Sequence, residues 1–419
     1  MFVTKPLRRL PTALKNNRVV RFTTFSDPGK TFFSRKRELT EFKKVFNYEV
    51  PRINVILGPP NTGKTTLVRE VVSRDNFNPL FIDCRGGHFN TPTSLYNSLL
   101  CQFDSFFNNK LSKRHDYSKD YSEKTAKDII KLLNTIDEYF PTWEQPPILI
   151  IDEVNKFSQL GSSKEGEIIL VSFLDWLVKI TKQEKKFHTV LITSDSLFLD
   201  WITQSKFILI IVFGSEIFYI FTFVLLAVLD TSHVTPYVVG DLSRDEAEEF
   251  FEKYVLPRHD FKVRKELEGK FNHISEITGT RMFTINQFVD EYEIHKGDFE
   301  KFSVYQQEYD RLRCGLYPEA LNLANLARNT HAPLWNKSDF IETIKTIVES
   351  HKKFILEHDL VKLIGKSKVD SLLKYKFLYK RPTNNFVNDI INPPNKPILT
   401  PMNQPSMYAM KNLLKRKYS

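Results

Sequence analysis

The sequence predicts an α/β fold in which a parallel sheet flanked by helices is followed by a small helical segment and a C-terminal domain of three helices and a strand hairpin. Three observations carry this prediction. Residues 53–57 form an apolar run rich in β-branched residues that leads through a glycine-containing loop into a helical pattern. Residues 148–151 form a second apolar run, which ends in two acids. Beyond about residue 296 such runs stop and short helical patterns take over.

Length and composition limit the classes of protein to consider. A chain of 419 residues is too long for one core and predicts two or three domains of roughly 100–200 residues each. Its cysteines, Cys84, Cys101 and Cys314, lie far apart without a CxxC pair, which argues against a disulfide framework or a zinc site and suits a reducing, intracellular compartment. The net charge of +10 favours polyanionic partners such as nucleotides, nucleic acid or an anionic membrane surface.

The first apolar run leads into the clearest motif of the chain. Residues 58–65 read Gly-Pro-Pro-Asn-Thr-Gly-Lys-Thr, a complete GxxxxGK[ST] P-loop between a strand and a helix. Backbone N–H groups of such a loop face phosphates, and the helix N-terminus adds its positive dipole end. We expect Lys64 to reach the β- and γ-phosphates of ATP and the Thr65 hydroxyl to ligate Mg²⁺. The predicted nucleotide-binding residues of this motif are Gly58, Pro59, Pro60, Asn61, Thr62, Gly63, Lys64, Thr65 and Thr66.

The second apolar run supplies the acids that a phosphate-transfer site needs. Asp152 emerges at the end of this strand, where a carboxylate organises Mg²⁺, so Thr65 and Asp152 are the predicted metal ligands. Glu153 follows directly and is predicted to be the general base that polarises the attacking water. An apolar run ending in Asp-Glu is a weak signal alone, but the P-loop upstream makes it a strong one.

Three further segments complete the predicted sheet. They are residues 78–85, residues 187–196 and a fifth strand within residues 235–243. We expect Thr193 or Ser194, at the polar end of the second of these, to sense the γ-phosphate and to join Lys64 and Glu153 in the catalytic set. The alternative is that both residues end the strand for turn chemistry alone.

The motifs occur in the order typical of the archaeal-type ATPase family. Besides the P-loop and the acidic strand, they include Phe-Phe-Ser-Arg at residues 32–35, Gly-Asp-Leu-Ser at 240–243 and Ile-Thr-Gly-Thr-Arg at 277–281. Over roughly residues 32–295 the chain resembles this STAND/AAA-like group, which is also similar to origin-recognition ATPases. The resemblance implies that the segment around Phe33 and Arg35 packs near the adenine, although Ser34 replaces the usual glycine.

The resemblance also implies a small helical lid over the nucleotide. Ser243 and Glu246 are predicted to form a capping box for the first lid helix. Where the family often has Gly-x-Pro, this chain has Gly279-Thr-Arg281, which puts the lid contact in doubt. Arg281 is then either a phosphate contact or a surface arginine.

Arginine is absent from a long part of the predicted core. None occurs between Arg114 and Arg244, so the end of the 187–196 strand lacks the arginine that many relatives place there. An arginine finger contributes roughly 10³–10⁵ in rate. We therefore expect the chain to hydrolyse ATP slowly alone, to work as a switch, or to receive an arginine from a partner or a second copy.

The C-terminal third shows a different pattern. Residues 338–351, 357–365 and 367–377 read as three short helices, and residues 375–390 as a hairpin around Pro-Thr-Asn-Asn. Three helices and a hairpin is the winged-helix pattern, which can bind DNA phosphates or dock proteins. The basic residues that would bind phosphate are Lys368, Lys374, Lys376, Lys380 and Arg381. The tail from residue 411 is short and basic, and we expect it to be frayed.

Two segments raise the question of targeting and membranes. Residues 1–26 carry six basic residues and no acid, which resembles either a mitochondrial transit peptide or a disordered basic arm, so the expected location is cytoplasmic or mitochondrial. Residues 207–229 are apolar except for Glu216 and long enough to cross a bilayer. A true span would divide the predicted sheet, so we favour an insertion or mis-spliced sequence, then a core segment, over a membrane span.

These observations predict an ATP-binding and ATP-hydrolysing, Mg²⁺-dependent molecular switch that binds ATP and ADP and acts on a protein partner or through self-association. The alternatives are an ATP-regulated DNA-binding protein and a membrane-attached ATPase. The predicted boundaries are 1–31 for a basic arm or targeting segment, 32–240 for the ATPase core with the 207–229 insertion, 241–295 for the lid, 296–337 for a connecting helical segment, 338–400 for the winged-helix-like domain and 401–419 for a basic tail.

Overall fold

The structure is a computed structural model that describes most of the chain. The described residues are 33, 35–74, 77–108, 111, 122–140, 146–204, 234–321, 332–382, 389–390 and 392–418. The chain divides into two units, Met1–Phe33 and Ser34–Ser419, and every element below belongs to the second. The predictions for residues 1–31 and 207–229 fall outside the described residues. Of the helices in the described ranges, none is long and apolar enough to cross a membrane.

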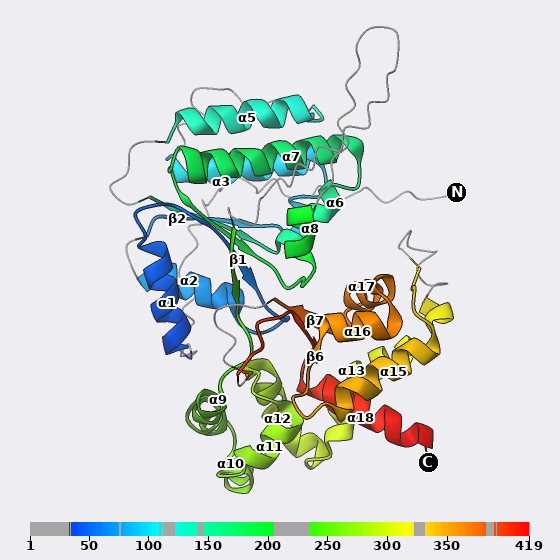
Figure 1. Ribbon diagram of the computed structural model, residues 1–419. Coiled ribbons are helices and arrows are strands. Elements are labelled where there is room, and N and C mark those ends of the chain that lie inside the picture. The colour runs from blue at the N-terminus through cyan, green and yellow to red at the C-terminus, as the bar shows by residue number, and fades with distance from the viewer. Residues whose placement is uncertain are drawn as a thin grey trace, which may run out of the picture. The chain divides into compact units, whose positions relative to one another are not determined.

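A five-stranded parallel sheet forms the centre of the predicted core, residues 32–240, as the sequence predicts (Figure 1). Its strands lie in the order β2-β3-β4-β1-β5. Three of them are buried at every position, because a parallel sheet is covered by helices on both faces. The strands are β1 (Ile53–Leu57), β2 (Pro79–Asp83), β3 (Ile148–Asp152), β4 (His188–Ile192) and β5 (Val234–Val238).

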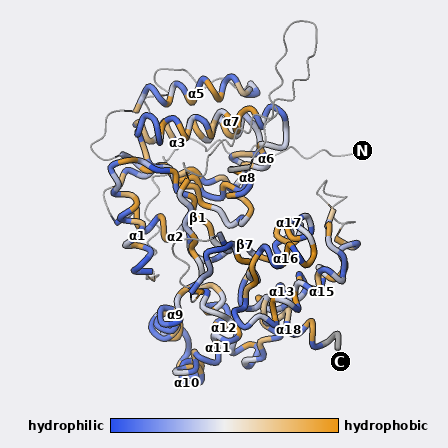
Figure 2. Tube along the Cα trace, viewed as in Figure 1, coloured by the Kyte–Doolittle hydropathy of each residue, from blue (hydrophilic) through white to orange (hydrophobic). Residues whose placement is uncertain are grey.

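Helices cover this sheet on both sides. Figure 1 shows α3, α5 and α7 layered over one face and α1 and α2 on the other, and Figure 2 shows the apolar colouring concentrated in the strands between them. Buried phenylalanines such as Phe89, Phe103 and Phe173 fill the space under the first layer. The helices are α1 (Lys36–Phe46), α2 (Lys64–Arg74), α3 (Pro92–Phe106), α5 (Ala126–Glu138), α6 (Phe157–Leu160), α7 (Lys164–Val178) and α8 (Phe198–Gln204).

A buried histidine joins the sheet to the chain before β1. His188 begins β4, and its Nδ1 accepts a hydrogen bond from the Arg52 N–H (3.4 Å). The other ring nitrogen, Nε2, therefore carries the proton and donates to Tyr48 O (3.1 Å). Burial lowers the pKa of His188 to about 4, so the ring is neutral in the folded protein at neutral pH.

We expect His188 to make the fold sensitive to acid. Its ordinary pKa is 6.5, so below that pH the unfolded chain binds the extra proton and the folded chain does not. The free energy of unfolding should then fall as the pH drops from about 6.5 towards 4, by at most about 3 kcal/mol from this residue. Urea unfolding at pH 7 and pH 5 measures the effect, and His188→Gln should lose less stability than wild type. An equal loss would exclude His188 as the cause.

The lid is a group of helices that follows β5. Ser243 caps α9 as predicted: its hydroxyl accepts from the Glu246 N–H, and the Glu246 carboxylate accepts from the Ser243 N–H. The lid helices and the next helix are α9 (Arg244–Phe250), α10 (Phe261–Leu267), α11 (Phe271–Thr278), α12 (Met282–His295) and α13 (Ser303–Gly315).

The C-terminal region, residues 337–418, combines helices with a small antiparallel sheet of order β6-β8-β7. The three predicted helices are present. The predicted hairpin is not confirmed: β7 pairs with β8, and most of the predicted second strand falls outside the described residues. Of that strand, Asp389 lies in a bend where its carboxylate meets Arg381. The elements are α15 (Lys337–Glu349), β6 (Ile355–Leu356), α16 (Glu357–Ile364), α17 (Lys366–Lys374), β7 (Leu378–Arg381), β8 (Ile398–Pro401) and α18 (Gln404–Tyr418).

The prediction of a frayed tail is wrong. Residues 404–418 form helix α18, which packs against α13 and α11. Met407, Met410 and Leu413 are buried because their spacing of three places them on one face of the helix. The Asn412 amide adds a hydrogen bond to the Tyr305 hydroxyl (2.9 Å). The basic residues of the tail concealed this apolar stripe.

Candidate nucleotide-binding site

The P-loop links β1 to α2, where the motif requires it. Gly58 needs to be glycine, because a Cβ there would lie 2.2 Å from Val239 O at the end of β5. Gly63 has a φ of +85°, in the region that favours glycine. The Thr62 hydroxyl donates to Pro59 O (3.0 Å) and closes the turn. The predicted residues 58–66 thus form one loop that runs into the N-terminus of α2.

The Lys64 ammonium lies inside this loop. It donates to Gly58 O (2.8 Å) and Pro59 O (2.9 Å) and is almost fully buried. Burial lowers its pKa to about 8, and the positive charges of Arg281 and Arg35 contribute to the fall. A phosphate chain would supply the negative charge that two neutral carbonyls do not, so the position favours a polyphosphate.

The two predicted metal ligands meet at the edge of the sheet. The Thr65 hydroxyl donates to Asp152 Oδ2 (3.0 Å), at the end of β3. Burial raises the pKa of Asp152, and the Thr65 hydrogen bond opposes that rise. A hydroxyl and a carboxylate side by side are the oxygen ligands that Mg²⁺ prefers, with water and phosphate completing its shell. The residues present therefore fit Mg²⁺.

Glu153 is held in an unusual backbone conformation. Its φ is +59°, which few residues with a side chain adopt, and its N–H donates to Asp152 Oδ1 (3.0 Å). With its amide nitrogen facing Glu153, Asn155 donates to Glu153 Oε2 (3.1 Å). The Thr193 hydroxyl lies 3.4 Å from the same Asn155 amide. Asn155 was missed by the sequence analysis, and its only signal was a polar residue in the turn after the acidic strand.

Of the two predicted sensor residues, Thr193 is the one connected to Glu153 through Asn155. The Thr193 hydroxyl also accepts from the Asp195 N–H (3.0 Å), which is the turn role that the sequence left open. Ser194, the next residue, is partly exposed. A sensing role for either residue stays a prediction.

Arg35 fastens the P-loop to the segment after β5. Its buried guanidinium donates to Thr62 O (3.0 Å) and Gly240 O (2.8 Å) and pairs with Glu38. Phe33 belongs to the other unit, Met1–Phe33. The predicted position of both residues near the adenine stays a prediction.

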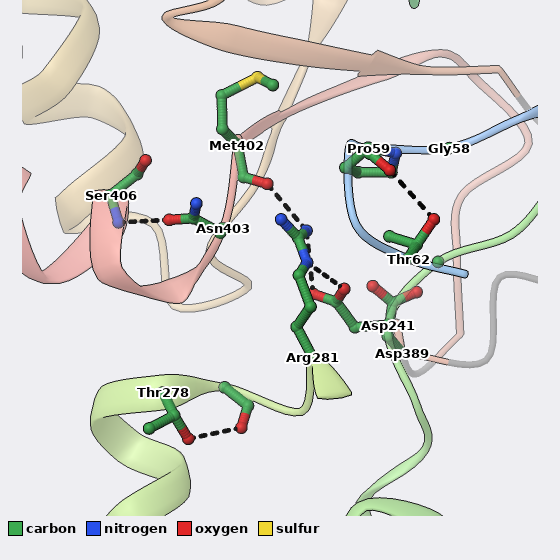
Figure 3. A network of polar contacts seen from close by, with 12 residues as sticks. Gly58, Pro59, Thr62, Asp241, Thr278, Arg281, Asp389, Met402, Asn403 and Ser406 are labelled. Carbon is green, nitrogen blue, oxygen red and sulfur yellow. Dashed lines mark hydrogen bonds and ion pairs between the residues drawn. The ribbon is translucent and has the colours of Figure 1, made fainter. Parts of the chain in front are cut away.

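Arg281 is a buried ion-pairing residue, so its interpretation as a surface arginine is wrong (Figure 3). Its Nε donates to Asp241 Oδ1 (2.6 Å), and its Nη2 donates to Met402 O (2.9 Å). The cause is that Asp241, in the segment between β5 and α9, and Met402, from the C-terminal region, both supply acceptors beside it.

A P-loop with a buried lysine, opposite a strand that ends in Asp-Glu on a five-stranded parallel sheet, defines a P-loop ATPase domain. Residues 32–216 match the model of an ATPase domain found predominantly in Archaea. The resemblance predicted from the sequence is thus confirmed for the ATPase domain.

Several relatives similar to this chain are described as ATP-binding proteins. An uncharacterised ATP-binding protein of Methanocaldococcus jannaschii is 27% identical over 199 residues, covering 40% of this chain and 54% of the relative. Another, of Pyrococcus abyssi, is 25% identical over 193 residues, covering 40% and 55%. The chain therefore spans about half the length of the curated relatives it matches.

Two solved structures are similar over most of the chain. The Walker-type ATPase of Pyrococcus abyssi has a TM-score of 0.49 at 15% identity, covering 91% of this chain and 96% of its own. The ORC2 protein of Aeropyrum pernix, in ADPNP–ADP complexes, has a TM-score of 0.39 at 13% identity, covering 92% and 94%.

Proposed function

We propose that the chain is an ATP-binding and ATP-hydrolysing, Mg²⁺-dependent molecular switch of the STAND/AAA-like type. In this switch the nucleotide state controls how the C-terminal region docks on the core and lid. The observation that carries the proposal is Arg281, a lid residue whose guanidinium bonds both Asp241, in the segment that leads from β5 into the lid, and Met402 of the C-terminal region. One side chain thereby joins the lid to the C-terminal region where the lid leaves the core.

The position of Arg281 explains how ATP would act on the docking. Its positive charge contributes to the lowered pKa of Lys64, after the larger effect of burial, so the two cations lie within electrostatic range of each other. A polyphosphate beside Lys64 attracts Arg281 away from Asp241 and Met402 O. Loss of those bonds weakens the docking of the C-terminal region.

Strand β7 of the C-terminal region lies against the core at two further points. Lys380 pairs with Asp200 of α8 (2.6 Å), as well as with Glu357 (3.1 Å). Asp389, which Arg381 holds, approaches the core so closely that a Cβ on Gly240 would lie 2.4 Å from its Oδ1. The C-terminal region therefore packs closely against the core next to the Gly-Asp-Leu-Ser segment.

Tyr379 of β7 lies close to the P-loop. Its side chain is buried, and burial raises the pKa of its phenol. The backbone of Gly58, the first P-loop residue, lies within range of this phenol, whose oxygen has no hydrogen-bond partner among the described residues. A movement of Gly58 on nucleotide binding would therefore change the surroundings of β7.

The chemistry assigned to the site uses residues of this chain. Glu153 accepts the proton of the attacking water, and Asn155 and Thr193 fix the direction of its carboxylate. Lys64 and the loop N–H groups stabilise the charge on the phosphates. Thr65 and Asp152 would hold Mg²⁺, which supplies positive charge to the transferred phosphate.

The DNA-binding alternative is weakened by the ion pairs of the C-terminal region. Three of the five cations predicted to meet phosphate are occupied by carboxylates. Lys368, Lys380 and Arg381 pair with Asp339, Asp200 and Asp389 at 2.9, 2.6 and 2.7 Å. A protein-docking role for this region fits the structure better.

Lys380→Ala tests the linkage between docking and ATP binding. The variant loses the pairs to Asp200 and Glu357, so docking weakens while the P-loop residues stay unchanged. Because ATP competes with docking, we expect ATP to bind about two- to tenfold more tightly, measured by calorimetry in a Glu153→Gln background. The exposed Lys362 of α16 gives the matched control, Lys362→Ala, with unchanged affinity. Unchanged or weaker binding by Lys380→Ala would refute the switch and leave the ATPase site intact.

A further inference from the structure

We propose that Arg85 is a phosphate-contacting arginine supplied in cis. When Mg²⁺ binds the Asp152 carboxylate, the Arg85 guanidinium moves from Asp152 to the terminal phosphate of ATP. The inference rests on the proposed ATPase function. It adds a residue, Arg85, and the event that releases it, which is Mg²⁺ binding at Asp152. Arg85 follows β2 and is the last residue of the predicted strand segment 78–85, to which the sequence analysis assigned no role in the site.

The sheet itself brings Arg85 to the site. In the parallel pairing of β2 with β3, Asp83 lies opposite Asp152. The Cys84 N–H donates to Asp152 O (3.0 Å), which continues the pairing by one residue. Arg85 therefore emerges at the carboxyl edge of the sheet, next to the acid that organises Mg²⁺.

The guanidinium bridges two acids. Its Nη2 donates to Asp152 Oδ2 (3.0 Å), and its Nε donates to Asp83 Oδ1 (2.9 Å). Asp152 Oδ2 is also the oxygen that accepts from the Thr65 hydroxyl (3.0 Å). Arg85 and a metal held by Thr65 and Asp152 would thus compete for one carboxylate, whose side chain is 1% exposed.

Arg85 is free to make this exchange. Its side chain is 54% exposed, so its release from Asp152 requires no repacking of the core. Gly86 and Gly87 follow directly with φ values of +75° and +87°, which gives the backbone after Arg85 unusual conformational freedom. The pair with Asp83 keeps the guanidinium at the sheet edge after Asp152 is lost to Mg²⁺.

Two other arginines, Arg281 and Arg244, belong to the lid and not to the carboxyl edge of β2 and β3. Arg281 pairs with Asp241, and Arg244 donates to Ser275 (2.7 Å) and to Asn272 within the lid. No arginine occurs from residue 115 to residue 243, so the strands β3, β4 and β5 bring none to the site. Arg85, which follows β2, supplies a positive charge at the strand ends, where the arginine-free stretch of residues 115–243 supplies no arginine.

The test compares Arg85→Gln with wild type for binding of ATP and ADP, each with saturating Mg²⁺, by calorimetry. We expect ATP binding to weaken about tenfold, because the contact to the terminal phosphate is lost, while ADP binding stays equal or tightens. Turnover should fall about 10³-fold, as for loss of an arginine finger. Arg85→Lys keeps the charge and should recover part of the preference for ATP.

The control is Arg74→Gln, a half-exposed arginine of α2 that pairs with Glu70, and it should leave both affinities unchanged. Equal loss of ATP and ADP binding by Arg85→Gln would assign Arg85 a structural role and overturn the inference. So would affinities that match wild type. If wild type itself binds neither nucleotide, the proposed function fails instead, which separates the two claims.

Discussion

Lys64→Ala should abolish ATP binding, with a Kd at least about 100-fold weaker than that of wild type. The ammonium is buried inside the P-loop, where it donates two hydrogen bonds to loop carbonyls. The same donors turned to the β- and γ-phosphates form charge-assisted bonds of roughly 1.5–3 kcal/mol each, and their sum exceeds the stated loss. Calorimetric titration with ATP measures it directly.

An exposed lysine provides the control for this variant. Lys36→Ala, on the surface of α1, removes the same charge from the net total and should bind ATP as wild type does. Lys64→Ala with the affinity of wild type would mean that residues 58–66 do not form a nucleotide site. Thermal unfolding of both variants shows whether the fold is kept.

Glu153→Gln should keep ATP affinity and lose turnover by about 10²–10⁴, the range for removal of a general base. The amide has the shape of the carboxylate and still accepts the hydrogen bond from Asn155, but it does not accept a proton from water. Asp152→Ala should differ, because it removes a predicted Mg²⁺ ligand and therefore Mg²⁺-dependent binding. Phosphate release and ATP binding, measured on the same preparations, separate the two variants.

Glu167→Gln is the matched control, since Glu167 is an exposed acid on α7. It should hydrolyse ATP at the wild-type rate. Wild-type turnover in Glu153→Gln would exclude Glu153 as the base and direct attention to another acid at the site.

The sequence was most informative where local pattern and burial coincide. Strands β1, β3 and β4 are buried at every position, so their apolar runs stand out and their ends locate the P-loop lysine and the Asp-Glu pair. The P-loop is a contiguous motif, and its chemistry depends on neighbours in sequence. These parts of the fold and site could therefore be predicted.

The predictions failed where partners are distant in the chain. β7 pairs with a strand that starts 17 residues after it ends, and no local turn signal specifies that register. Arg85 reaches Asp152 only because β2 and β3 are neighbours in the sheet. Arg281 is buried because Met402, more than a hundred residues later, covers it. Such contacts depend on tertiary pairing, which a single sequence does not display.

The central claim is that ATP binding releases the C-terminal region from the core and lid. Hydrogen exchange of Glu153→Gln, free and with Mg²⁺ and ATP or ADP, tests it most directly, because this variant holds ATP without consuming it. The account predicts slower exchange in the loop 58–66 and faster exchange in β7, β8 and α18 with ATP than without nucleotide, and no such change in Lys64→Ala. Protection of the loop with unchanged exchange in β7, β8 and α18 would contradict it.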